Sequence, residues 1–258
     1  AKAHTPRFLT RDKIYLWDYP LANGERPEVN EAIVDAFNNG TLIVNYVGHG
    51  NPDVWAHEHV FERSSDLPKL ANPVQLPLVF AASCAIGFFD DPNREGMAED
   101  LLAMQGGAIG VISATRLVYS ADNAAFNKVV FDNLLFQESL SICEAMFAGK
   151  LQRQYPGPRP NDNDRAYIFL GDPCTRLAMP RLSAEFDVRP VSLKALDRAR
   201  VSGRIVDATG QTYQGDGVAQ VKVFDSDRAR KYTLVDDNGN VIHTVSYAVT
   251  GPSIFRGS

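Results

Sequence analysis

Two apolar stretches, each followed by a reactive side chain, constrain the fold of this sequence most. Residues 41–48 read Thr-Leu-Ile-Val-Asn-Tyr-Val-Gly and are followed by His49. Residues 77–83 read Pro-Leu-Val-Phe-Ala-Ala-Ser and are followed by Cys84. Short runs of β-branched and aromatic residues bounded by Gly or Pro are typical of strands buried in a parallel sheet. We therefore predict two neighbouring parallel strands that place His49 and Cys84 beyond the same edge of one sheet.

The rest of the first 180 residues alternates between strand and helix patterns. This order predicts an α/β domain with a mostly parallel sheet flanked by helices. The first strand, the helix after it and the His49 strand are expected to form a right-handed crossover. Residues 51–72 read as a long connection with one helical turn near Ser65 to Leu67. The other expected elements are strands at 12–17, 108–113 and 167–170 and helices at 27–39, 96–104, 121–135 and 138–153.

The pattern changes after Pro180. Residues 201–207, 218–224 and 241–249 alternate at period two, and turn residues separate them at 207–210 and 237–240. No helical pattern intervenes, so we expect a small all-β immunoglobulin-like domain at 181–258. About four strands can be counted, fewer than the usual seven, which predicts a truncated domain. The chain also lacks an initiator Met, so the first domain, at 1–180, could lack its N-terminal part.

Charge and cysteine usage narrow the range of functions. A net charge of -5 over 258 residues argues against general affinity for nucleic acid or anionic lipid. No apolar run approaches the roughly 20 residues of a membrane span, so no transmembrane segment is expected. The chain has three cysteines and no metal-type Cys-x-x-Cys spacing. Cys143 lies in a helical pattern and Cys174 follows a strand, and both are predicted to be buried. Only Cys84 has a setting that indicates chemistry.

His49 and Cys84 together predict a nucleophile and base. A thiolate is the attacking species, and a neighbouring imidazole can take the thiol proton and later protonate a leaving amine. Gly50 leaves room for a substrate beside the histidine. The backbone amides of Gly50 and Cys84 could donate to the oxyanion of a tetrahedral intermediate. Either residue alone would be a weak signal, but their placement at one sheet edge favours a Cys-His dyad.

Four sequence blocks carry a family resemblance. They are Asn-Tyr-Val-Gly-His-Gly-Asn-Pro-Asp-Val-Trp at 45–55, Ala-Ser-Cys-Ala-Ile-Gly-Phe-Phe-Asp-Asp at 82–91, Ser-Ala-Thr-Arg at 113–116 and Phe-Leu-Gly-Asp-Pro at 169–173. Over roughly 12–180 the chain resembles the gingipain family of caspase-like (clan CD) cysteine peptidases. The form it resembles most is the sortase-like component of the type IX secretion system. In that family an immunoglobulin-like domain follows the peptidase domain.

The resemblance implies a caspase-like fold with His49 and Cys84 as the catalytic dyad. It implies an exported protein, at the outer membrane or surface of a bacterium, that acts on a protein or peptide substrate beside other secretion-system proteins. The implied reaction is cleavage of carboxy-terminal sorting signals through a thioester, which can pass to water or to an amine of a surface lipopolysaccharide. No cofactor is implied, although relatives use structural calcium. An oxygen-rich loop that could bind calcium contains Asp90, Asp91 and Asn93.

The supporting residues are less well determined. No acid that would orient His49 can be carried over from the family, and Asp18 is the candidate within this chain. Arg116 follows the third parallel strand, where it could bind a substrate carboxylate or backbone carbonyl. Equally, it could be an ion-pair partner of Asp90 or Asp91. Nothing in the sequence indicates a deep acidic pocket that would select Arg or Lys.

Two other function classes are open. His57, Glu58 and His59 contain a His-x-His pair that could join His49 in a metal hydrolase, although no acidic fourth ligand is evident. The chain could instead be a catalytically silent, peptidase-like scaffold of a secretion complex, with the β domain as its contact surface. Retention of both His49 and Cys84 argues against that reading.

Overall fold

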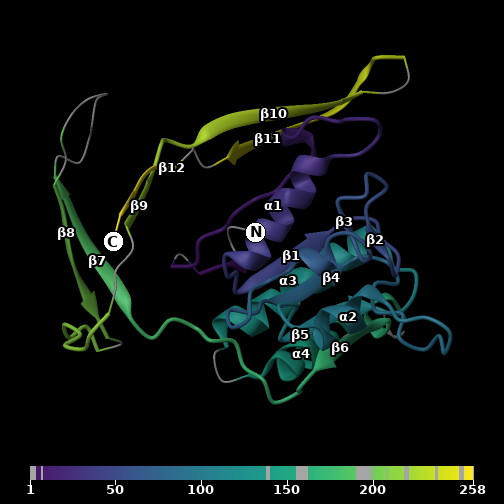
Figure 1. The fold of residues 1–258 in the computed structure, drawn as a ribbon, viewed down its shortest axis with the longest axis horizontal. Helices are drawn as coiled ribbons and strands as arrows, with labels where there is room; N and C mark the ends of the chain where they lie inside the picture. Colours follow the sequence, from purple (N-terminus) through teal and green to yellow (C-terminus); the bar gives the residue numbers. More distant parts are fainter. Residues whose placement is uncertain are drawn as a thin grey trace. The chain divides into compact units, whose positions relative to one another are not determined.

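The computed structural model describes residues 4–6, 8–137, 140–154, 162–189, 198, 200–207, 209–217, 221–235, 238–249 and 253–257. The chain separates into two compact units, Ala1–Met179 and Pro180–Ser258 (Figure 1). Each unit is described by itself below. Among the described residues, no helix combines the length and the apolar character that crossing a membrane requires.

A four-stranded sheet organises the first unit. Its strand order is β1 (Ile43–Val47), β4 (Leu78–Ala82), β5 (Gly110–Ala114) and β6 (Tyr167–Gly171). The first three strands run parallel, and β6 is antiparallel to β5. Every residue of β4 and β5 is buried, as expected for the central strands of a covered sheet. The predicted α/β class with a mostly parallel sheet flanked by helices is confirmed.

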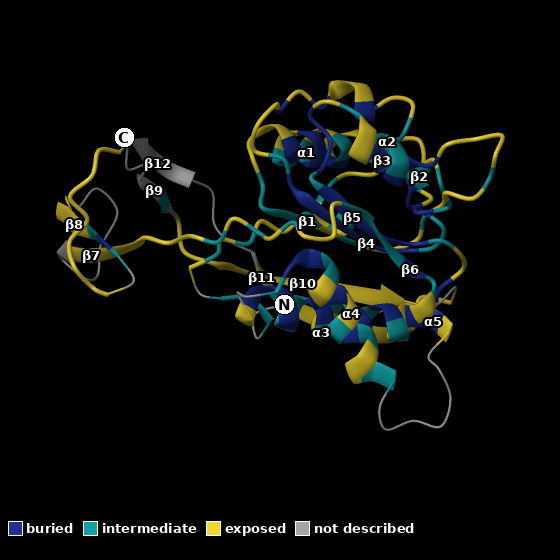
Figure 2. Ribbon diagram, turned by 90° about the horizontal axis from the view of Figure 1, so that it is seen from below, coloured by how far each residue is buried: buried dark blue, intermediate teal, exposed yellow. Residues whose placement is uncertain are grey.

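Helices cover both faces of this sheet. Figure 2 shows α1 (Pro27–Asn38) and α2 (Met97–Ala103) on one face and α3 (Ser120–Phe136) and α4 (Ile142–Gln154) on the other. The core is correspondingly divided. Val79 and Ala81 of β4 pack with the α1 and α2 side chains, whereas Leu78, Phe80 and Ala82 pack with those of α3 and α4. The alternation along one strand thus supplies two separate hydrophobic layers.

The α1 helix follows directly from its sequence. Pro27 occupies the first turn, where its missing N–H costs nothing, and Gly40 follows the helix with φ +83. The apolar face predicted for this helix is the buried one. Its buried residues are Val29, Ile33, Val34 and Phe37.

Short elements connect the main ones. The long connection after β1 contains a small hairpin of β2 (Val54–Trp55) and β3 (Phe61–Glu62), followed by the predicted helical turn, η3 (Leu67–Lys69). The fragment α5 (Asp162–Arg165) precedes β6.

Several sequence predictions for this unit are wrong. Residues 12–17 do not form a strand, and the only regular element there among the described residues is a 3₁₀ turn, η2 (Leu16–Asp18). The backbone carbonyl of Leu16 accepts a hydrogen bond from the Arg26 guanidinium instead of pairing with a strand. The expected strand–helix–strand crossover is therefore absent from the described residues. Two other errors concern burial, because Cys174 is exposed and Cys143 is only half-buried.

The second unit is all-β in its described part. Its strands form three antiparallel pairs. The predicted strands at 201–207 and 241–249 are present, and residues 221–224 of the predicted strand at 218–224 form a strand, whereas residues 218–220 lie outside the described residues. Three further strands, β7, β10 and β12, were not predicted. Within the described residues no pair joins a third strand, so the immunoglobulin-like sandwich stays a prediction. The pairs are β7 (Ser183–Arg189) with β8 (Arg200–Val206), β9 (Val221–Phe224) with β12 (Ser253–Gly257), and β10 (Arg228–Val235) with β11 (Val241–Val249).

Candidate active site

The pairing register of β1 and β4 brings the His49 and Cys84 loops to one sheet edge. Val47 pairs with Ala82 at the end of the ladder, and each paired residue is 35 positions from its partner. His49 and Cys84 are also 35 positions apart, two residues beyond that last pair. Both strands run in the same direction, so both loops leave the sheet at its carboxyl edge.

Gly50 allows the two loops to touch. A Cβ atom on this residue would lie 2.6 Å from Ser83 Oγ and 2.9 Å from Ile86 Cδ1. Ser83 directly precedes Cys84, so the glycine lets the histidine loop pack against the cysteine loop. The His49 carbonyl accepts hydrogen bonds from the Ala56 amide at 2.8 Å and from the Tyr46 hydroxyl. Burial raises the pKa of Tyr46, so its hydroxyl stays a donor at neutral pH.

Cys84 is half-buried at the start of a sharp turn. It packs with the α3 and α4 side of the core, continuing the alternation of Phe80 and Ala82. Its thiol contacts the Val118 carbonyl oxygen at 3.4 Å. Ala85, the next residue, has φ +50, which is strained for a residue with a Cβ. Strain of this kind is common where a backbone must present a reactive group.

Three buried hydroxyl groups lie in the structure around the turn. Ser83, Ser113 and Tyr167 are 0% exposed, and none of their hydroxyl oxygens has a hydrogen-bond partner in the described structure. Burial raises the pKa of Tyr167, and the negative charge of Cys84 in its thiolate form raises it further. The phenol is therefore protonated at neutral pH.

The His49 side chain is exposed. Its ring centroid lies 5.6 Å from that of His57, with the planes tilted by 42°. The charge of Asp18, in η2, contributes to the raised pKa of Tyr19, for which burial is the larger cause. The role of Asp18 as the orienting acid of His49 stays a prediction.

The two proposed oxyanion donors are not used by the fold. Within the described residues, neither the Gly50 amide nor the Cys84 amide donates to a protein acceptor. The bonds that hold these loops come from their neighbours. The Asn51 amide donates to Val54, and the Ala85 amide donates to Arg116. The role of the Gly50 and Cys84 amides as oxyanion donors stays a prediction.

Arg116 is held by Asp90, which was one of the two interpretations of this residue. Its guanidinium makes a bidentate pair with the Asp90 carboxylate, at 3.0 Å and 2.6 Å. It also lies 4.9 Å from the ring centroid of Phe88. The Arg116 hydrogen bonds lower the pKa of Asp90. Substrate binding by Arg116 would require this pair to open, and that role stays a prediction.

The two carboxylates of the predicted calcium loop have protein partners in the structure, and calcium binding there stays a prediction. Asp90 faces Arg116, and the Asp91 carboxylate accepts the Asn93 amide at 2.9 Å, as in an ordinary turn.

A charge network that sequence reasoning missed joins the histidine side of the site to the cysteine side. Arg63 binds Asp100 of α2 at 2.5 Å and lies 3.9 Å from Asp53 and 3.6 Å from Glu95. Arg94 also pairs with Asp53. The network borders a hollow of about 500 Å³. Arg63 and Asp100 are 37 positions apart in sequence, so no local pattern could reveal their pairing.

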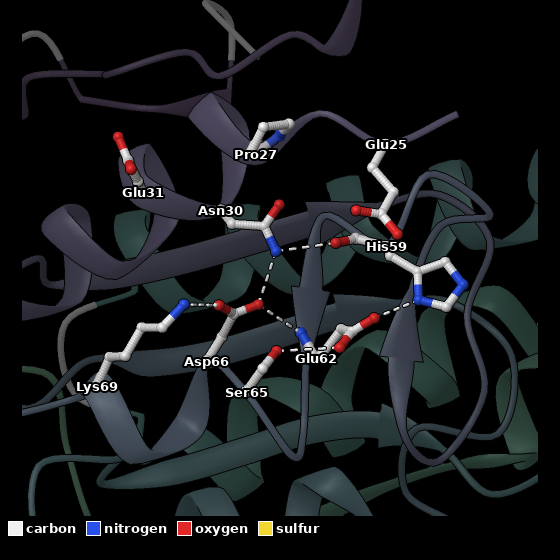
Figure 3. A pocket seen from close by; sticks show the side chains of 9 residues that line it. All are labelled: Glu25, Pro27, Asn30, Glu31, His59, Glu62, Ser65, Asp66 and Lys69. Atoms are coloured by element: carbon white, nitrogen blue, oxygen red, sulfur yellow. Dashed lines mark hydrogen bonds and ion pairs between the residues drawn. The ribbon is translucent and has the colours of Figure 1, made fainter. Parts of the chain in front are cut away.

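A second hollow, of about 230 Å³, contains His59 and lies beside α1 (Figure 3). The buried Asp66 carboxylate is satisfied there by Lys69, Asn30 and the Glu62 amide. The His59 ring pairs with the Glu62 carboxylate. No group of three potential metal ligands occurs among the residues that the structure describes, so the metal-hydrolase reading finds no support.

Comparison with known proteins points to one family. The family model for peptidase family C25 matches residues 1–178. A 57-residue segment is 40% identical to gingipain R2 of Porphyromonas gingivalis strain ATCC 33277, covering 22% of this chain and 8% of that protein. An 88-residue segment is 34% identical to gingipain R2 of strain W83, covering 32% of this chain and 12% of that protein.

Solved structures of gingipains are also similar. The crystal structure of the Arg specific cysteine proteinase gingipain R has a TM-score of 0.49 at 23% identity, over 87% of this chain and 50% of that chain. The complex of the pro- and mature domains of RgpB from Porphyromonas gingivalis has a TM-score of 0.48 at 22% identity, over 87% and 51%. The chain therefore spans about half the length of these solved relatives.

Proposed function

The chain belongs to peptidase family C25, and we propose that it is a cysteine endopeptidase in which Cys84 is the nucleophile and His49 is the base. The observation that carries this proposal is the shared 35-residue offset of the β1–β4 ladder and of the His49–Cys84 pair. The contact of Gly50 with Ser83 gives it further support, because it brings the two loops together at that edge.

The proposed reaction has two halves. The Cys84 thiol passes its proton to the imidazole of His49, and the thiolate attacks the scissile carbonyl carbon. The Gly50 and Cys84 amides donate to the resulting oxyanion. The tetrahedral intermediate then collapses, the C–N bond breaks, and the imidazolium returns its proton to the leaving amine. This half-reaction leaves a thioester on Cys84 and releases the carboxy-terminal fragment.

The second half determines whether the enzyme is a hydrolase or a transpeptidase. Water or an amine attacks the thioester and regenerates the thiol, with His49 taking the proton of the attacking group. We propose that the substrate is the carboxy-terminal sorting signal of an exported protein and that a surface lipopolysaccharide amine can be the acceptor. This finer proposal depends on the resemblance to the type IX secretion sortase PorU, as do the cell-surface location and the secretion-system partners.

Thiol reactivity tests the dyad, and this chain contains its own control. Cys174 is exposed, whereas Cys84 is half-buried. If exposure alone governed the reaction, iodoacetamide would alkylate Cys174 faster. We expect the reverse, since a thiol beside an imidazole that can accept its proton reacts faster than a thiol without such a base. His49→Ala should remove this preference, as followed by peptide mass mapping. A catalytically silent scaffold would show no preference for Cys84 in the unmodified protein.

Turnover tests the reaction itself. The protein is incubated with a peptide that ends in a candidate sorting signal, with and without an amine acceptor, and the product masses are measured. Cys84→Ala should lower the rate on the order of 10⁴-fold or more, because it removes the attacking group. A product that carries the amine indicates transfer, and a shortened peptide alone indicates hydrolysis. Unchanged turnover in Cys84→Ala would contradict the proposed function.

A further inference from the structure

The loop that contacts the nucleophile presents two exposed apolar side chains. The Cys84 thiol lies 3.4 Å from the carbonyl oxygen of Val118, whose side chain is buried at 8% exposure. The residues on either side of Val118 are exposed instead. Leu117 is 81% exposed and Tyr119 is 75% exposed. Two large apolar side chains thus flank the residue that touches the reactive sulfur.

The backbone of this loop is held at both ends. At its start, the amide and the hydroxyl of Thr115 both donate to the Ala166 carbonyl, at 2.9 Å and 3.1 Å. At its end, the Tyr119 amide donates to the buried side chain of Asn163 at 2.6 Å. Asn163 in turn donates to Asn123 of α3. With both ends bonded and Val118 in the core, the loop cannot easily turn Leu117 and Tyr119 inward.

The charges nearest to these side chains are largely paired. Arg116 lies between Thr115 and Leu117 in sequence, and its guanidinium forms an ion pair with Asp90. In the loop that follows Cys84, Glu95 pairs with Arg63, and the Asp91 carboxylate accepts a hydrogen bond from the Asn93 backbone amide. Leu117 and Tyr119 therefore offer apolar contact area in a loop whose own charged residue, Arg116, is already paired.

We propose that Leu117 and Tyr119 determine substrate specificity by contacting an apolar side chain, the size of Leu or Phe, next to the scissile bond. The inference rests on the proposed function, since it requires a peptide substrate at Cys84. Covering Leu117 and Tyr119 with an apolar side chain removes apolar area from water on both partners. A basic side chain in the same position would lose hydration of its charged end against these two apolar side chains. The enzyme therefore discriminates against Arg and Lys at this position.

Active-site probes that differ in a single residue test this specificity. Peptidyl acyloxymethyl ketones carry the same sequence with Leu, Phe, Arg or Asp at the position next to the reactive carbonyl. The rate of Cys84 labelling is followed by mass spectrometry on the full chain. We expect the Leu and Phe probes to react about 10- to 100-fold faster than the Arg probe, the range that apolar contacts with one side chain can supply.

Three variants and a matched control assign the preference to the loop. Leu117→Ser and Tyr119→Ser should each slow the Leu and Phe probes by about tenfold and leave alkylation of Cys84 by iodoacetamide unchanged. Leu117→Glu should raise the relative rate of the Arg probe, because it supplies the missing carboxylate. Val74→Ser is the control, since Val74 is also 81% exposed but precedes β4, at the opposite end of that strand from Cys84. This variant should behave like the unmodified protein.

The outcomes separate this inference from the proposed function. Faster labelling by the Arg or Asp probe, or equal rates for all probes, overturns the apolar specificity and leaves the peptidase proposal standing. Unchanged probe selectivity in both serine variants overturns the assignment to Leu117 and Tyr119. Failure of every peptidyl probe to label Cys84 overturns the proposed function, and this inference with it.

Discussion

The two sides of the candidate active site are held in place by different kinds of interaction. On the cysteine side, the backbone and the core position the nucleophile. Cys84 packs with α3 and α4, and the Ala85 and Gly87 amides after it donate to the carbonyls of Arg116 and Ala114, at 3.1 Å and 2.9 Å. This side follows from the path of β4 and β5 and the packing between the sheet and its helices.

On the histidine side, polar side chains add to the backbone bond that the Ala56 amide donates to the His49 carbonyl. The side-chain oxygen of Asn51 accepts hydrogen bonds from the backbone amides of Asp53 and Val54, at 2.8 Å and 3.1 Å. The Asp53 carboxylate in turn forms ion pairs with Arg63 and Arg94. The only direct backbone bond from this segment to α2 among the described residues is the Met97 amide donating to Pro52 at 2.8 Å. The nucleophile should therefore respond to changes in packing, and the base to changes in charge.

The contact between the two sides gives the largest expected effect. In Gly50→Ala the new Cβ would lie 2.6 Å from Ser83 Oγ, so the histidine loop must move away from the cysteine loop. Catalysis is sensitive to shifts of about 1 Å, and we expect kcat/KM to fall by roughly 10²-fold. Peptide cleavage kinetics measure this loss.

A second glycine provides the control for that variant. A Cβ on Gly217, in the other unit, meets nothing within 4 Å, so Gly217→Ala should have normal kinetics. The thermal unfolding midpoints of both variants show whether folding is intact. Normal activity of a folded Gly50→Ala would mean that catalysis does not require close contact between the histidine loop and the cysteine loop.

Removal of the Arg63 side-chain charge tests the histidine side of the site separately from the cysteine side. Arg63→Met keeps much of the side-chain volume but leaves Asp100 without its 2.5 Å partner and Asp53 with Arg94 alone. We expect kcat to fall by roughly tenfold while KM changes little, because the base moves and the apolar loop at Leu117 and Tyr119 does not. Steady-state kinetics at low salt measure this split.

Salt distinguishes positioning by charge from a general loss of structure. At about 1 M NaCl the screening length is roughly 3 Å, so the difference in kcat between the unmodified enzyme and Arg63→Met should become smaller. Arg204→Met is the matched control, because Arg204 makes a 2.7 Å pair with Glu185 on the exposed surface of the second unit. An equal salt effect on both variants would contradict a special role of the Arg63 network.

The parts of the fold that sequence reasoning predicted are those that the strand and helix patterns determine locally. The strands at 43–47, 78–82 and 110–114, and the buried face of α1, follow from periodicity and from glycine or proline at their ends. The expectation that His49 and Cys84 share an edge needed only the direction of two strands. The strand prediction for residues 12–17 was wrong because apolar and polar residues also alternate in a segment that packs its apolar side chains on the core without pairing with a strand.

The remaining features depend on contacts between distant residues. The Arg63 network joins charges that are ordinary surface residues in sequence, and the exposure of Cys174 depends on how the chain continues after β6. The loop at Leu117 and Tyr119 could have been noticed, because an apolar run between a strand and a helix usually belongs to the core. Only the structure shows that Val118 alone is buried there.

The smallest effect is expected for Arg116, and it decides between the two interpretations of that residue. Arg116 and Asp90 are 55% and 44% exposed, so their pair should contribute little, and Arg116→Gln should change probe labelling by less than about fivefold. Because the pair lowers the pKa of Asp90 below its ordinary 3.8, its contribution to stability is present above that pH and is lost as the pH falls through the lowered value. Thermal unfolding from pH 3 to pH 7 should therefore show a small, constant difference between Arg116→Gln and the unmodified protein above about pH 5, which disappears at the acidic end. A rise in KM of tenfold or more for Arg116→Gln would mean instead that Arg116 leaves Asp90 to bind substrate, and the cysteine side would then also depend on charge.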